Sequence, residues 1–353
     1  MLTIGVDAHK AVHAAVAIDD AGRELARWRG ANRRDAWEEL HRWAEALGEE
    51  RRWGIEGAGG YGRRLAQHLV SERETVFEVN ARLTAGGRLR ARKMDKTDDL
   101  DAAAVARIVR QEGRALPQVH AEDESAVLSL LTTEREELLR EGTRIQNQLH
   151  HLLLQLDPEY KTRLRSLKSK RGLSVLAELR APDDDPLQLH RASAIRRLAA
   201  RLALTTSHAK DVASQIRTLA SVRYAPLTQV CGVDLLTAGM LAGMLGPGQR
   251  FESDSQLAAY AGVAPIEASS AGRVRHRLSR GGNRQLNSIV YRIVVTQAHH
   301  SEDAKAYLAR RISQGKTKRE AHRALRRYIV RVLWHLWREC HLVGTAAELG
   351  VAA

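Results

Sequence analysis

Residues 2–7, Leu2-Thr3-Ile4-Gly5-Val6-Asp7, form a short apolar run that ends on a carboxylate. A run of this length and composition is typical of a buried strand. A second apolar run covers residues 12–18, and Asp19-Asp20-Ala21-Gly22 predicts a turn into a third strand at residues 23–29. The chain is therefore expected to begin with three strands joined by hairpin connections.

Helices and strands are expected to alternate after these hairpins. Trp37, Leu40, Trp43 and Leu47 have helical spacing and predict a helix over residues 34–47. Further segments predict a strand at 53–56, a helix at 61–70, a strand at 75–79 and a helix at 100–109. The order β-β-β-α-β-α-β-α predicts a mixed sheet with helices on its faces. This α/β order resembles a ribonuclease H-like (RuvC-like) domain, which we assign to residues 1–118.

Long helices without strand patterns are expected over residues 119–224. Leu131, Leu138, Ile145 and Leu152 recur every seven residues, while Arg135 and Gly142 interrupt the companion seam. Asp157-Pro158 ends the first helix, and residues 182–186 begin a return helix. This predicts a long antiparallel helical arm of coiled-coil type. Oligomerisation and contact with nucleic acid are both compatible uses of such an arm.

A third, mostly helical domain is expected over residues 225–353. Residues 228–234 turn into a helix at 235–245, which gives a helix-hairpin-helix-like segment at the start of the domain. Backbone amides at such a turn are able to hold a phosphate, although glycine-containing turns between helices are also common without one. Residues 263–282 are rich in Ser, Gly and Arg and predict a loop or ribbon.

Composition excludes several classes of protein. The chain has 353 residues and is 44% apolar, which is enough to fill ordinary cores and excludes disorder as the main state. We expect no membrane association, because no apolar run reaches the roughly 18 residues of a membrane-spanning helix. We also expect no secretory signal. Two cysteines, Cys231 and Cys340, cannot build a disulfide framework or a four-cysteine zinc site, so a cytoplasmic location is expected.

Positive charge is concentrated in one region. The whole chain carries a net charge of +14, and residues 273–339 contain 17 basic and four acidic residues, a net +13. This segregation of charge predicts a polyanionic partner, because solvation alone does not require it. Nucleic acid is the favoured partner, with anionic lipid and a merely solvated face as the alternatives.

Three acidic motifs predict a metal site. Asp7 ends the first strand, Glu56 ends the fourth, and Asp98 and Asp101 share one face of a later helix. Clustered carboxylates repel one another unless a cation lies between them, and oxygen ligands of this kind suit Mg²⁺ or Mn²⁺. Two such ions would clamp a scissile phosphodiester. Alternatively these acids are polar strand ends or helix N-caps, and Asp99 is assigned to capping or solvent.

A serine loop lies in the basic region. Residues 264–284 contain Ser269 and Ser270 among Arg273, Arg275, Arg277, Arg280 and Arg284. A serine there is able to attack phosphorus, since the arginines would favour its alkoxide and hold the phosphate. Plain phosphate binding is the commoner role of such loops, and both readings remain open from the residues alone.

Together these motifs resemble the DEDD transposases of bacterial insertion sequences, which are bridge-RNA-guided serine recombinases. The resemblance covers nearly the whole chain. The three acidic motifs are Ile4 to Lys10, Ile55 to Gly59 and Lys96 to Ala102. Val230 to Gly246 resembles the helix-hairpin-helix segment, and Ala261 to Ser270 with Ser279 to Asn283 resembles the C-terminal signature.

The resemblance implies a function. Asp7, Glu56, Asp98 and Asp101 would bind Mg²⁺ or Mn²⁺, and Ser270 would form a transient phosphoserine link to DNA. The partners would be donor and target DNA, a structured guide RNA and further copies of the chain in a dimer or tetramer. The family's serine is followed by Gly, whereas Ala271 stands here, so Ser269 is the alternative nucleophile. A metal-dependent junction resolvase or nuclease without a serine nucleophile, and a non-catalytic nucleic-acid-binding protein, are the rival functions.

Overall fold

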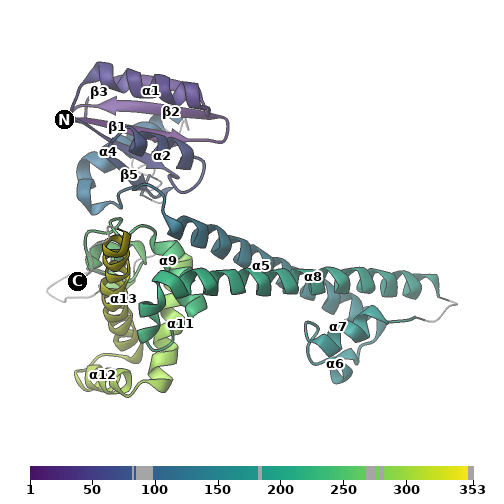
Figure 1. The fold of residues 1–353 in the computed structure, drawn as a ribbon. Coiled ribbons are helices and arrows are strands. Elements are labelled where there is room, and N and C mark those ends of the chain that lie inside the picture. The colour runs from purple at the N-terminus through teal and green to yellow at the C-terminus, as the bar shows by residue number, and fades with distance from the viewer. Residues whose placement is uncertain (82, 85–97, 182–184, 268–275, 279–281, 349–353) are drawn as a thin grey trace. The chain divides into compact units, whose positions relative to one another are not determined.

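A computed structural model describes residues 1–81, 83–84, 98–181, 185–267, 276–278 and 282–348. They form two compact units (Figure 1). Unit 1 contains residues 1–125, 226–233 and 245–353, and unit 2 contains residues 126–225 and 234–244.

A five-stranded mixed sheet forms the N-terminal part of unit 1. Its strands are β1 (Leu2–Ala8), β2 (Val12–Ile18), β3 (Glu24–Ala31), β4 (Arg51–Glu56) and β5 (Val76–Val79), in the spatial order β3-β2-β1-β4-β5. The hairpin strands pair antiparallel, whereas β4 is parallel to both β1 and β5. The predicted mixed α/β sheet is thereby confirmed.

Helices cover both faces of this sheet. Ile4 and Val6 belong to a core with Trp37 and Leu40 of α1 (Arg34–Leu47) and with Leu65 of α2 (Arg63–Ser71). On the opposite face, Val16 and other β2 residues pack against three alanines of α4 (Asp98–Glu112). Because side chains alternate along a strand, odd-numbered residues of β1 and even-numbered residues of β4 face α4.

Two glycines allow α4 to approach the sheet closely. A Cβ at Gly5 would lie 2.2 Å from both the Ala102 carbonyl oxygen and the Ala106 backbone nitrogen. At Gly54 of β4 a Cβ would lie 2.2 Å from a methyl group of Val109. The helix backbone therefore rests directly on β1, and any larger side chain there would displace it.

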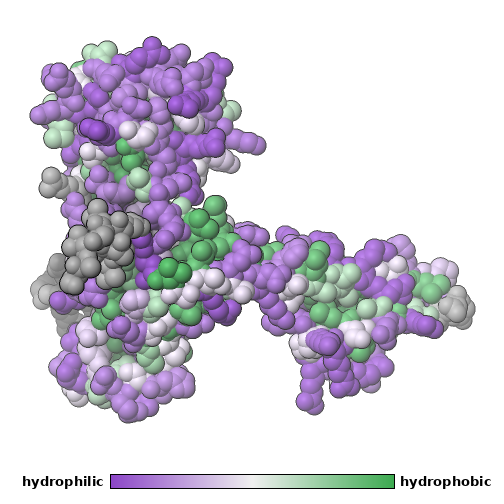
Figure 2. All heavy atoms as spheres, in the orientation of Figure 1, coloured by the Kyte–Doolittle hydropathy of each residue, from purple (hydrophilic) through white to green (hydrophobic). Residues whose placement is uncertain are grey.

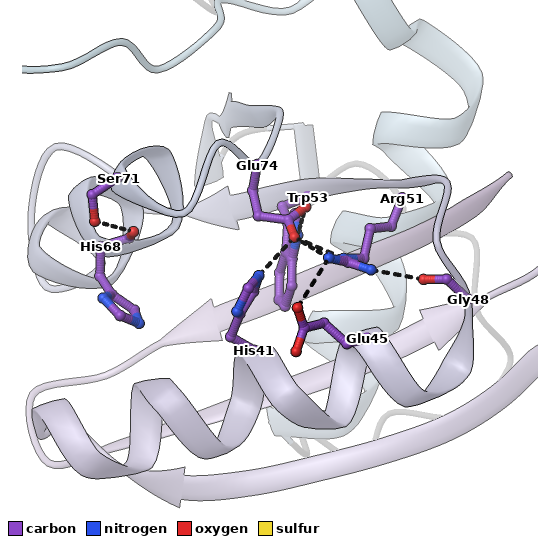
Figure 3. A network of polar contacts seen from close by, with 8 residues as sticks. All are labelled: His41, Glu45, Gly48, Arg51, Trp53, His68, Ser71 and Glu74. Carbon is purple, nitrogen blue, oxygen red and sulfur yellow. Dashed lines mark hydrogen bonds and ion pairs between the residues drawn. The ribbon is translucent and has the colours of Figure 1, made fainter.

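A buried carboxylate ties α1 to the start of β4 and to the connection before β5 (Figure 3). Glu74, with a side chain only 6% exposed, accepts hydrogen bonds from Arg51 Nε at 2.7 Å and from the indole N–H of Trp53 at 2.9 Å. His41 Nε2 lies 2.8 Å from the same carboxylate. Buried charges are stable when they are paired and hydrogen-bonded in this way.

The helical arm lies in unit 2. It contains α5 (Glu124–Leu156) and α8 (Pro186–Arg223), which run antiparallel with their buried residues in one core. The short helices α6 (Tyr160–Arg163) and α7 (Lys170–Ala177), between α5 and α8 in the chain, complete that core. Leu128 and Leu149 of the interrupted seam are fully buried, whereas Leu131 and Leu138 of the regular seam are only half-buried.

Helix α9 (Leu235–Leu245) also packs within unit 2. A Cβ at Gly239 would lie 2.5 Å from a methyl group of Ile216 on α8, and one at Gly243 would lie 2.6 Å from the backbone of α5 at Leu128. The turn before α9 follows η2 (Ala225–Gln229) and contains Gly232 with φ +90°. These small residues allow three helices to meet at short range.

The remainder of unit 1 is mostly helical. It contains η1 (Gly113–Ala115), α10 (Asp254–Tyr260), α11 (Arg284–His300), α12 (Glu302–Ser313) and α13 (Lys318–Glu348). Strands β6 (Pro265–Glu267) and β7 (His276–Leu278) pair antiparallel, which confirms the predicted ribbon. Trp337 of α13 is fully buried and donates its indole N–H to the Gly246 carbonyl at 3.0 Å. Among the described residues, no helix has the length and apolarity required to span a bilayer.

Candidate metal centre and serine loop

Asp7 and Glu56 lie side by side at the ends of two neighbouring strands. They are paired residues in the parallel register of β1 and β4. Gly5 and Gly54 lie beneath α4, and residues two positions apart on a strand face the same side of the sheet. Asp7 and Glu56 therefore also face α4. Asp7 is buried and Glu56 is half-buried.

Helix α4 brings two further carboxylates to the same face. Asp98 is in the first turn and is half-buried, while Asp101, one turn later, is only 6% exposed. Asp101 directly precedes Ala102, whose carbonyl oxygen lies over Gly5. The close contact of α4 with β1 therefore sets the distance between the helix carboxylates and Asp7.

The electrostatics of Asp7 reflect this crowding. Burial raises the pKa of its carboxyl above the usual value, and the Asp101 and Asp98 carboxylates raise it further. His9 acts in the opposite direction through its charge and a hydrogen bond, and offsets part of the rise. Burial is thus the main reason for the raised pKa of Asp7, and the two neighbouring carboxylates add to it.

His9 joins this cluster and was not anticipated from the sequence. Its Nε2 lies 3.0 Å from Asp7 Oδ2 and 3.5 Å from Asp98 Oδ1. Ligand atoms of Asp7, His9 and Asp98 all lie within 4.8 Å of one another, which is the spacing of a possible metal site. The sequence could have indicated this position of His9, because residues two apart in an extended chain, such as Asp7 and His9, lie on the same side.

Arginines of β3 orient the start of α4. Arg29 donates to Asp98 Oδ2 at 2.7 Å, which leaves Oδ1 directed toward His9. Arg27 donates to Asp99 at 3.3 Å. Asp99, expected in a cap or in solvent, therefore forms an ion pair away from the cluster.

The donor set fits a divalent cation. Carboxylate oxygens are the ligands that Mg²⁺ and Mn²⁺ prefer, and Mn²⁺ also accepts an imidazole nitrogen. Ligand atoms of Asp7, Asp98 and His9, which follows β1, lie close together, while Glu56 is beside Asp7 on β4 and Asp101 is one turn from Asp98 on α4. Their arrangement resembles the clusters in which bound ions act on a phosphodiester.

Residues 268–275 and 279–281 of the serine loop lie outside the described residues, and these include Ser269, Ser270, Arg273, Arg275 and Arg280. Arg277 lies on β7, and Arg284 is exposed at the start of α11.

The base of the loop is closely packed. A Cβ at Gly282 would lie 2.2 Å from the backbone nitrogen of Gly262. Asn283 donates its backbone N–H to the Tyr260 carbonyl at 2.6 Å, and the Asn287 amide donates to the Ala261 carbonyl at 2.9 Å. The segments that flank the loop are therefore held together by a backbone hydrogen bond, by the Asn287 side chain and by a close approach of Gly282 to Gly262 that leaves no room for a Cβ at Gly282.

Two protein-family models match parts of the chain. Residues 4–158 match the model of the DEDD transposases of IS110, described as transposase. Residues 224–309 match the model described as the transposase IS116/IS110/IS902 family. The chain carries the domains of an insertion-sequence transposase. The first match contains Asp7, Glu56, Asp98 and Asp101, and the second contains the serine loop.

Relatives of this transposase belong to insertion elements of several bacteria. The 42 kDa protein of insertion element IS900 from Mycobacterium paratuberculosis is 26% identical, over 99% of this chain and 98% of that protein. The 43.6 kDa protein of insertion element IS110 from Streptomyces coelicolor is 27% identical, over 69% of this chain and 71% of that protein. The transposase for insertion sequence element IS1328 from Yersinia enterocolitica is 23% identical, over 69% of this chain and 72% of that protein.

Proposed function

We propose that this transposase cuts and rejoins DNA strands at a site composed of the carboxylate cluster and the serine loop. The observation that carries the proposal is the convergence of Asp7, Glu56, Asp98 and Asp101 on the α4 face of the sheet. The strand order β3-β2-β1-β4-β5 supports a ribonuclease H-like domain, because it places β1 and β4 next to each other as that resemblance implies.

The four carboxylates would hold Mg²⁺ or Mn²⁺, and His9 is placed to contribute to the same site. Bound ions of this kind stabilise charge on a scissile phosphate and on its leaving oxygen. Asp98 would be oriented by Arg29, which occupies one of its two oxygens.

Ser270 is the proposed nucleophile, with Ser269 as the alternative register. The serine oxygen would form a bond to phosphorus as it loses its proton. The bond from phosphorus to the 3′ oxygen would break, and that oxygen would leave as a hydroxyl. Attack by another 3′ hydroxyl would reverse these events and release the serine. The number of phosphoester bonds is conserved, so exchange would need no ATP.

The partners follow from the same proposal. Donor and target DNA would contact the basic region, including Arg273, Arg275, Arg277, Arg280 and Arg284, and a structured guide RNA would pair with both. Apolar side chains exposed along α5 and α8 support a homo-oligomer, a dimer or tetramer, formed through the arm (Figure 2). The cytoplasm is the proposed location, since the DNA substrate lies there.

Metal binding is tested without catalysis by titrating Mn²⁺ and following its free electron paramagnetic resonance signal. We expect Asp7→Asn and Asp101→Asn to weaken Mn²⁺ binding at least tenfold. Mn²⁺ at 100 times its dissociation constant should stabilise the wild type by about 2.7 kcal/mol. Glu38→Gln, on the exposed surface of α1, is the matched control. Undiminished Mn²⁺ binding by an Asp7→Asn/Asp98→Asn double variant would contradict the proposal.

The serine is tested by mass spectrometry of the complex trapped on a nicked suicide substrate. A nucleotide on Ser270 supports the recombinase, and one on Ser269 corrects the register. The rival function, a metal-dependent nuclease, predicts cleavage with no adduct and full activity in a Ser269→Ala/Ser270→Ala protein.

A further inference from the structure

A pair of tyrosines lies on the helical hairpin formed by α12 and α13. The rings of Tyr307 on α12 and Tyr328 on α13 stack with their centroids 6.2 Å apart and their planes 25° apart. Tyr307 is half-buried, whereas Tyr328 is 56% exposed. One aromatic ring of the pair is therefore available to a partner.

Cations surround the pair. Arg310 and Arg311 follow Tyr307 by one turn, and their guanidinium carbons lie 5.4 Å and 5.9 Å from its ring centroid. Exposed Lys316, Lys318 and Arg319 lie in the turn and at the start of α13. Residues 302–331 contain ten basic and three acidic residues. The surface over α12 is correspondingly hydrophilic (Figure 2).

Packing of the hairpin does not account for Tyr328. The apolar contacts of α12 and α13 are made by fully or nearly buried residues such as Leu308, Ala321 and Leu325. An aromatic ring that leaves more than half of its surface in water, beside several arginines, matches the composition of surfaces that bind unpaired bases. In such surfaces bases stack on aromatic rings and cations follow the phosphates. Duplex DNA offers its phosphates but no free base face.

We propose that the Tyr307–Tyr328 pair is a platform for an unpaired nucleic-acid strand. A base would stack on the exposed ring of Tyr328, and the adjacent phosphates would pair with Arg310, Arg311 and Lys318. The inference rests on the proposed function only in taking nucleic acid as the partner. It assigns to α12 and α13 a role that is separate from the carboxylate cluster and the serine loop.

The chain supplies a matched control. Tyr291 on α11 is 47% exposed, similar to Tyr328, but its ring is covered by the guanidinium of Arg326 at 4.7 Å. Substitution of Tyr291 removes a similarly exposed aromatic ring from the same basic region that is not part of the Tyr307–Tyr328 pair.

The test is fluorescence anisotropy of the full chain with labelled 12-nucleotide strands of RNA and DNA and with the 12-base-pair duplex. We expect Tyr328→Leu to weaken binding of a single strand by about tenfold, since loss of base stacking has effects of this order. Duplex binding should change by less than twofold. Tyr328→Phe, which keeps the ring, and Tyr291→Leu should both bind as the wild type does. A larger effect on RNA or on DNA identifies which strand is bound, and either result supports the platform.

A second readout reports stacking itself. A 2-aminopurine in the strand should be quenched by the wild type and by Tyr328→Phe, but not by Tyr328→Leu. The platform is refuted by an unchanged single-strand affinity in Tyr328→Leu, or by an equal loss on the duplex or in Tyr291→Leu. A chain that binds no nucleic acid would contradict the proposed function as well. If the chain cuts duplex DNA but Tyr328→Leu binds single strands as tightly as the wild type, only the platform is contradicted.

Discussion

Replacement of Gly5 by alanine should separate the two halves of the carboxylate cluster. The added Cβ would lie 2.2 Å from the Ala102 carbonyl oxygen and from the Ala106 nitrogen, whereas ordinary van der Waals contact begins near 3.4 Å. Both obstacles are backbone atoms of α4, so no side chain is able to rotate away. The helix must retreat by about 1 Å, and Asp98 and Asp101 retreat with it.

The energetic and functional costs of this shift differ in size. Overpacking of a core by one methyl group costs about 1–3 kcal/mol, which lowers the melting temperature of unit 1 by roughly 2–10 °C and leaves it folded. A displacement of about 1 Å in a catalytic group is able to lower the rate about 100-fold. We therefore expect Gly5→Ala to remain folded but to lose strand exchange and to bind Mn²⁺ at least tenfold more weakly.

Thermal unfolding, Mn²⁺ titration and strand exchange measure these three effects on the same preparation. Gly48→Ala is the control, because an added Cβ there has nothing within 4 Å. If Gly5→Ala binds Mn²⁺ and exchanges strands as the Gly48→Ala protein does, the contact between α4 and β1 does not set the geometry of the cluster.

Three further substitutions or conditions probe other features. Glu74→Gln leaves the buried Arg51 with only the exposed Glu45, at 3.9 Å, as a charged partner and should destabilise unit 1 by roughly 3 kcal/mol in chemical denaturation, with Mn²⁺ binding by the folded protein unchanged. Gly282→Ala places a Cβ 2.2 Å from the Gly262 nitrogen and should abolish the covalent serine adduct while Mn²⁺ affinity stays within twofold. Duplex affinity should fall with salt by about 0.9 in log K per log salt for each phosphate neutralised. Arg310→Gln/Arg311→Gln should reduce that slope, and an unchanged slope would show that these arginines contact no phosphate.

The sequence was sufficient for the sheet and for the neighbouring positions of Asp7 and Glu56. Strong apolar runs marked β1, β2 and β4, and chain order restricted their pairing. The predicted helix at 34–47 and strand at 12–18 match the observed bounds. Strands β1 and β2 are buried on both faces and therefore appear as continuous apolar runs, whereas α1 is buried on one face and therefore shows helical spacing.

Long-range contacts were the part that sequence patterns did not reveal. Glu74 meets Arg51 and His41 through contacts between separate elements, and no period in the sequence marks them. Of the regular seam of α5, Ile145 and Leu152 join Leu149 in the core with α6, α7 and α8, whereas Leu131 and Leu138 are only half-buried. The assignments of Ser270, Arg273, Arg275 and Arg280 lie outside the described residues and stay predictions.

The position of α4 in the chain also has a consequence for synthesis on the ribosome. Asp7 and Glu56 emerge early, but the helix that covers Gly5 and brings Asp98 and Asp101 lies after all five strands of the sheet. A nascent chain that ends before residue 98 has at most half of the carboxylates and an open groove over β1. The proposed cation site therefore cannot assemble until translation has passed α4, and each newly made molecule would acquire it only then.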